Sequence, residues 1–154
     1  MPLLVLVVGG ETLCRSPLGA VLLDQALARA GVAAQVASAG LRAIPGHPVD
    51  TFTDLVAQKH GVDLRNHRAR ALTLPMLQTA SLVLTMDPML RQEVQDTAPH
   101  LSDRIRLFDE GSGARGIHDP RHRSIEFHQA VHLAMADATR VLAARLSECR
   151  YLSI

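Results

Sequence analysis

Residues 7–17, VVGGETLCRSP, place an arginine and several small residues at the point where an apolar strand meets a helix. A short loop in this position turns backbone N–H groups inward, and the dipole of the following helix adds to their attraction for anions. Arg15 supplies a planar guanidinium that suits two phosphate oxygens, and Ser16 supplies a hydroxyl. The spacing alone is equally consistent with a tight turn whose arginine is solvated. The residues of this candidate anion loop are Gly9, Gly10, Glu11, Thr12, Leu13, Cys14, Arg15 and Ser16.

Strands and helices alternate along the chain, which predicts an α/β fold with a parallel sheet and right-handed crossovers. In such sheets ligands bind outside the carboxyl ends of the strands, where the anion loop falls. The loop after the fourth strand can reach the same edge. Strands are expected at 3–8, 32–37, 81–86 and 105–108, and helices at 17–30 (with Ser16 as N-cap), 49–60, after Thr73, after Asp87 and at 124–147.

The bulk composition predicts one domain, residues 1–154, of ordinary soluble character. The formal net charge of +1 argues against binding nucleic acid through bulk charge. Two distant cysteines, Cys14 and Cys149, do not make a disulfide framework and suit a reducing, cytoplasmic setting. The apolar opening MPLLVLVV is too short for a signal peptide or a membrane span, so no membrane insertion is expected.

Five segments in order resemble the low-molecular-weight protein tyrosine phosphatases, whose signature is C-x5-R-[ST]-P after an apolar strand. They are residues 8–17, Ser38-Ala39-Gly40, the HRAR of 67–70, the LVLTMDPML of 82–90 and Asp119-Pro120. The stretches SAGLRAIPGHP and HDPRHRS look most like the bacterial subgroup linked to capsule and exopolysaccharide tyrosine kinases. The resemblance implies a three-layer α/β/α fold with a four-stranded parallel sheet of order 2-1-3-4. It also implies a monomer or weak dimer that needs no cofactor.

The mechanism implied by this resemblance is covalent. A cysteine thiolate attacks phosphorus, Arg15 clamps the equatorial oxygens and Asp119 protonates the leaving phenol. Water then hydrolyses the phosphocysteine, with the same aspartate as base. Ser38 and His67 match positions that brace the loop through hydrogen bonds. Taken without the resemblance, Asp119 is better interpreted as a helix or turn cap before Pro120.

This chain departs from the family pattern at the nucleophile itself, because Gly9 occupies the position of the cysteine. Glu11 replaces a glycine, and we expect strain there if the backbone needs a positive φ, which Gly9 and Gly10 could relieve. Glu11 points either inward, where it would pair with Arg15, or outward as a surface residue, which we favour. Thr12 replaces an asparagine that supports the loop.

Two further groups of residues need an interpretation. Cys14 matches the family's second cysteine, and its place at a helix N-terminus would lower its pKa. Its sulfur is nevertheless not in line with a phosphate held by Arg15, so we interpret it as a packed residue.

Arg121 and His122 follow Asp119-Pro120 where the family often has tyrosines, giving a polar, basic rim. His118, His128 and His132 lack reliable ligand spacing, and we expect no metal site.

Three hypotheses follow. The favoured one is a pseudophosphatase that binds phosphate or a phosphotyrosine-containing protein, such as a bacterial tyrosine kinase, in exopolysaccharide regulation. The second is an active phosphatase in which Asp119 and Arg15 act with water or Cys14 as the nucleophile. The third is an interaction protein whose former pocket is closed by Glu11.

Overall fold

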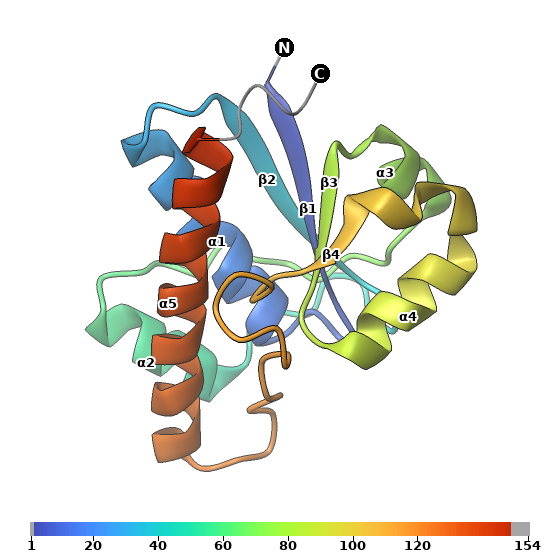
Figure 1. Ribbon diagram of the computed structural model, residues 1–154. Helices are drawn as coiled ribbons and strands as arrows, with labels where there is room; N and C mark the ends of the chain where they lie inside the picture. Colours follow the sequence, from blue (N-terminus) through green and yellow to red (C-terminus); the bar gives the residue numbers. More distant parts are fainter. Residues whose placement is uncertain (1, 149–154) are drawn as a thin grey trace.

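The structure is a computed structural model that describes residues 2–148. Four parallel strands form one sheet in the order β2-β1-β3-β4, which confirms the predicted topology. Figure 1 shows this sheet between two groups of helices. The strands are β1 (Leu3–Gly9), β2 (Ala34–Gly40), β3 (Leu82–Thr85) and β4 (Ile105–Leu107).

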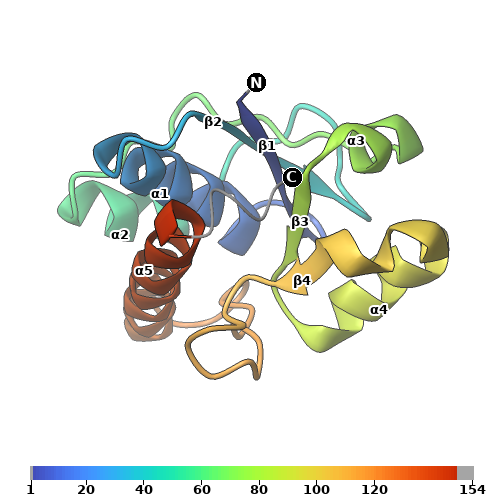
Figure 2. The same ribbon diagram turned by 45° about the horizontal axis from the view of Figure 1, so that its top comes forward.

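The helices cover both faces of the sheet and complete the three layers, as Figures 1 and 2 show from two sides. On one face lie α1 (Arg15–Arg29), α2 (Thr51–Lys59) and the long α5 (Ile125–Glu148). On the other lie α3 (Leu74–Thr79), α4 (Pro88–Thr97) and the 3-10 helix η1 (Pro99–Arg104). No helix within residues 2–148 is long and apolar enough to cross a membrane.

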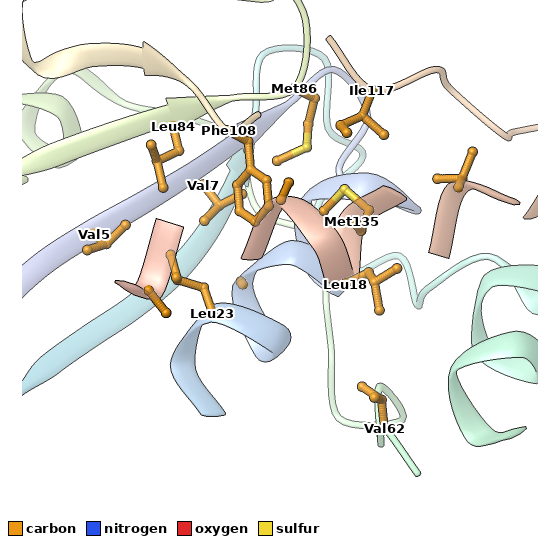
Figure 3. Packing of buried hydrophobic residues seen from close by; sticks show 14 of the residues in the cluster. Val5, Val7, Leu18, Leu23, Val62, Leu84, Met86, Phe108, Ile117 and Met135 are labelled. Carbon is orange, nitrogen blue, oxygen red and sulfur yellow. The ribbon is translucent and has the colours of Figure 1, made fainter. Parts of the chain in front are cut away.

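The central strand β1 is apolar throughout because both of its faces are covered. Val5 and Val7 pack with Phe108 and Met135 on the α1/α5 side, the cluster shown in Figure 3. Leu6 and Val8 belong to the cluster on the α3/α4 side. This buried strand carries the anion loop at its carboxyl end, so the base of the loop is fixed by the core of the protein.

Two helices begin at the side-chain caps that the sequence predicts, Thr73 and Asp87. Thr73 accepts a hydrogen bond from the N–H of Met76, and Asp87 accepts one from the N–H of Leu90. Each is followed by a proline within the first two helical positions, as helix starts favour. Asp50 caps α2, which therefore begins at Thr51 rather than at 49.

Two predicted element boundaries are wrong near the loop. The second strand runs from Ala34 to Gly40 instead of 32–37, because its ladder continues until Gly40 pairs with Gly9. The first helix begins at Arg15, and its N-cap is Cys14 without a side-chain hydrogen bond. Ser16 therefore lies inside the first turn, and its hydroxyl bonds to the loop instead of capping the helix.

Candidate active site

The anion loop is held from outside through its carbonyl groups. The oxygens of Gly9 and Gly10 accept hydrogen bonds from the N–H groups of Leu41 and Arg42, at 3.0 and 2.8 Å. The oxygen of Leu13 accepts one from Asp50 N–H at 2.9 Å. Within residues 2–148, the N–H groups of residues 10–14 donate to no other group of the chain. Because the loop carbonyls accept hydrogen bonds from outside the loop, these N–H groups remain available to an anion, which is one of the two interpretations that the spacing leaves open.

His67 braces the middle of the loop, at the position where the family resemblance implies a supporting residue. Its Nε2 lies 2.8 Å from the carbonyl oxygen of Thr12. Burial lowers the pKa of His67, which outweighs the opposing effect of the bond to Thr12. The ring is thus neutral at physiological pH, with the proton on Nε2 donated to the loop.

Ser38, the other predicted support, contacts the site differently. Its carbonyl oxygen accepts a hydrogen bond from Arg70 Nε at 3.0 Å, and its hydroxyl forms none within the described residues. Gly40, two residues later, touches the loop directly: a Cβ on Gly40 would lie 2.5 Å from the carbonyl oxygen of Gly10. This segment therefore supports the loop through close backbone packing rather than through a serine side chain.

The strained backbone position of the loop is Thr12 and not Glu11. Thr12 has a φ of 56°, a left-handed conformation that β-branched residues rarely adopt. Neither Gly9 nor Gly10 has a positive φ, so the expectation that they relieve strain is wrong. Ser16 Oγ donates a hydrogen bond to Thr12 Oγ1 at 2.8 Å, and both side chains are buried. That buried bond helps to hold Thr12 in its unfavourable conformation.

Gly9 closes the bottom of the loop. A Cβ placed on Gly9 would lie 2.8 Å from Ser16 Oγ and 3.2 Å from Ser16 Cβ. The hydroxyl of Ser16 therefore borders the space that a side chain at position 9 would need. Glycine offers no nucleophilic atom there, so no phosphoenzyme can form on residue 9.

The guanidinium of Arg15 is oriented by groups from the opposite side of the site. It donates to Asp87 Oδ2 at 2.9 Å and to the carbonyl oxygen of Ile117 at 2.5 Å. Asp87 also caps α4, so a single carboxylate fixes both the helix and the arginine. The sequence predicts Asp87 only as a helix start and misses its contact with Arg15. Its place in the family-like segment 82–90 is the feature of the sequence that points to a role for Asp87 in the site.

Asp119 and Arg15 line the same pocket. Oδ1 of Asp119 accepts a hydrogen bond from the backbone N–H of Arg121 at 3.1 Å, which closes a tight turn. Glu11 neither pairs with Arg15 nor stands alone at the surface. It forms an ion pair with the guanidinium of Arg121, which joins the anion loop to the Asp119 turn.

The anion loop, Arg15 and Asp119 line one pocket of about 360 Å³. A second ion pair borders it, between Arg42 and Glu93 at 2.8 Å. Met89, an exposed side chain, lies at its edge. The charged lining comprises Arg15, Arg42 and Arg121 against Glu11, Asp87, Glu93 and Asp119. Its formal charge is thus one negative, unlike the basic rim that the sequence predicts.

The side chain of Cys14 is buried in a small apolar cluster. It packs with Leu13 and Ala69 and is 5% exposed. Burial raises the pKa of Cys14 to about 12, and a hydrogen bond with Thr53 opposes this only in part. The expected lowering at the helix N-terminus is therefore wrong, because desolvation is the larger effect. Cys14 is a packed residue, as its position in the loop predicts.

The histidines of α5 lie behind the loop rather than in the pocket. His128 Nδ1 lies 3.2 Å from Thr53 Oγ1, and the ring of His132 stacks on that of His60 with centroids 4.1 Å apart. Within residues 2–148, no three side chains of His, Cys, Asp or Glu are grouped so that they could hold a metal ion.

Comparison with known proteins agrees with this architecture. The family model for low molecular weight phosphotyrosine protein phosphatase matches residues 4–151. The phosphatase Etp of Escherichia coli K12 is 34% identical over 143 residues, which cover 93% of this chain and 94% of Etp. The chain belongs to the low-molecular-weight protein tyrosine phosphatase family.

Two solved structures of related phosphatases share the fold of this chain. Wzb of Vibrio vulnificus in complex with benzylphosphonate matches with a TM-score of 0.88 and 29% identity, covering 95% of this chain and all of Wzb. Wzb of Escherichia coli K30 in complex with sulphate has a TM-score of 0.88 and 28% identity, covering 95% of this chain and 99% of Wzb. The four-stranded sheet predicted from the sequence is thus the sheet of this family.

Proposed function

We propose that this chain is a pseudophosphatase: a single-domain family member, residues 1–154, that binds phosphate or a phosphotyrosine-containing protein without hydrolysing it. The observation that carries the proposal is Gly9, the residue at the base of the loop, where the family mechanism requires a thiolate. The unbonded N–H groups and the oriented Arg15 support the binding half of the proposal. Arg15 and Asp119 keep the places of the phosphate clamp and the general acid.

The alternative nucleophile receives little support. A thiol with a pKa of about 12 is almost wholly protonated at neutral pH, and Cys14 is buried. An interaction protein with a pocket filled by Glu11 is also disfavoured, since Glu11 pairs with Arg121 and leaves a pocket of about 360 Å³.

The ligand and setting follow from the relatives. One related Wzb is described with benzylphosphonate, in which a CH2 group joins a phenyl ring to the phosphonate, and another with sulphate, a tetrahedral dianion. We infer that the same loop position in this chain takes the phosphoryl group of a phosphotyrosine. A cytoplasmic location of this chain, with a bacterial tyrosine kinase of exopolysaccharide regulation as its partner, fits the subgroup that the sequence resembles.

Calorimetric titration with inorganic phosphate and a phosphotyrosine peptide tests this proposal. We expect binding that weakens at least about tenfold in Arg15→Ala, because a charge-assisted, bidentate contact is lost. Arg140→Ala, which removes an exposed arginine of α5, is the matched control and leaves the affinity unchanged. Binding that does not depend on Arg15, or no binding at millimolar ligand, would refute the proposal.

A further inference from the structure

Two separate departures from the family pattern meet in space. Glu11 stands where the family has glycine, and Arg121 stands where it often has an aromatic residue. The two residues are 110 positions apart in the sequence, yet their side chains form an ion pair at the pocket. The Arg121 side chain is 23% exposed and that of Glu11 is 44% exposed. The guanidinium thus belongs to the pocket wall more than to the surface.

The turn that carries Arg121 is tightly defined. Asp119 Oδ1 accepts the N–H of Arg121, and the carbonyl oxygen of Pro120 accepts the N–H of Arg123 at 2.9 Å. His122 adopts a left-handed φ of 64° in this turn, and Pro120 is buried. The backbone therefore delivers the Arg121 guanidinium to the same pocket as Asp119.

The three arginines of the pocket are not equivalent. Arg15 is held by Asp87, which is committed to capping α4. The pair of Arg42 with Glu93 has side chains 57% and 42% exposed, so solvent screens it. Glu11 alone among the carboxylates belongs to the loop whose N–H groups would bind an anion. A dianion entering the loop would repel Glu11 and attract Arg121 at once.

We propose that Arg121 is a second anion-binding arginine whose guanidinium passes from Glu11 to a bound dianion. This inference rests on the proposed function, since it concerns the same pocket. A dianion can engage Arg15 and Arg121 together and so replace the lost ion pair. A monoanion has too little charge to displace the carboxylate. The pocket therefore selects dianionic phosphoryl or sulfuryl groups over monoanions.

The test is calorimetric titration with inorganic sulfate, a dianion, of the parent protein, Glu11→Gln, Arg121→Gln and the double variant. We expect Glu11→Gln to tighten sulfate binding about tenfold, because one carboxylate repulsion is removed. Arg121→Gln weakens binding about tenfold, and the same change made in Glu11→Gln abolishes the gain. Asp137→Asn and Arg140→Gln, from an exposed ion pair of α5 outside the pocket, are the matched controls and change affinity by less than about threefold.

The outcomes separate this inference from the proposed function. Equal sulfate affinity in Glu11→Gln and the double variant would overturn the role of Arg121. The proposed function would still stand if Arg15→Ala weakens sulfate binding. If neither the parent protein nor any variant binds sulfate, although thermal melts show them all folded, the proposed function fails and the inference with it.

Discussion

The thiol of Cys14 provides a sharp test of how the loop is packed. Burial raises its pKa to about 12, whereas an unfolded cysteine titrates near 8.5. At about pH 8 roughly one molecule in ten thousand then carries the thiolate, against about a quarter for a free cysteine. The side chain is also 5% exposed, so reagents reach it only when the loop opens. We predict that iodoacetamide alkylates Cys14 at least about a thousandfold more slowly than an exposed thiol.

The assay uses the Cys149→Ser variant, so that Cys14 is the only thiol, and mass spectrometry follows labelling with time. The same protein in denaturant is the control, because its thiol is exposed and ordinary. A folded-state rate within about tenfold of the denatured rate would refute the reasoning. It would also revive Cys14 as a nucleophile, since it would require a thiolate that is both accessible and populated.

Three further predictions concern stability, measured by urea unfolding. Burial, and to a lesser extent His60, lowers the pKa of His132 to about 4. The folded state therefore binds the proton of His132 less readily than the unfolded state does. The free energy of unfolding should fall by about 3 kcal/mol as the pH drops from about 6.5 to about 4. His132→Leu should flatten this acid limb, and an unchanged limb would contradict the assignment. Thr12→Asn should raise the free energy of unfolding by up to about 1 kcal/mol, because asparagine tolerates a left-handed φ better; a decrease would argue against strain at Thr12. Gly40→Ala should cost about 1–3 kcal/mol, because its Cβ meets the carbonyl oxygen of Gly10; a neutral effect would mean that the loop yields easily.

The sequence predicts the elements whose causes are local. An unbroken apolar run is typical of a strand covered on both faces, and β1 is such a strand. Thr73 and Asp87 cap helices because an oxygen-bearing side chain before a proline suits a helix start. The alternation of strands and helices predicts the parallel sheet, while the order of its strands came from the family resemblance.

Long-range contacts of single side chains could not be predicted in this way. Arg15 and Asp87 are 72 positions apart, and only the folded sheet brings the ends of β1 and β3 together. Glu11 and Arg121 differ from the family pattern in the sequence, but their pairing depends on the path of the turn after Asp119. Cys14 shows how a local rule fails: the helix N-terminus favours the thiolate, but burial beside Leu13 and Ala69 disfavours it more.

The most direct test of the account is turnover of p-nitrophenyl phosphate by the parent protein beside Gly9→Cys. In the variant Ser16 must rotate away from Thr12, because its hydroxyl lies 2.8 Å from the new Cβ, and it can then donate to the new sulfur. We predict no turnover by the parent and clear turnover by Gly9→Cys that disappears when Arg15→Ala is added. Turnover by the parent that disappears in Asp119→Ala would contradict the pseudophosphatase assignment.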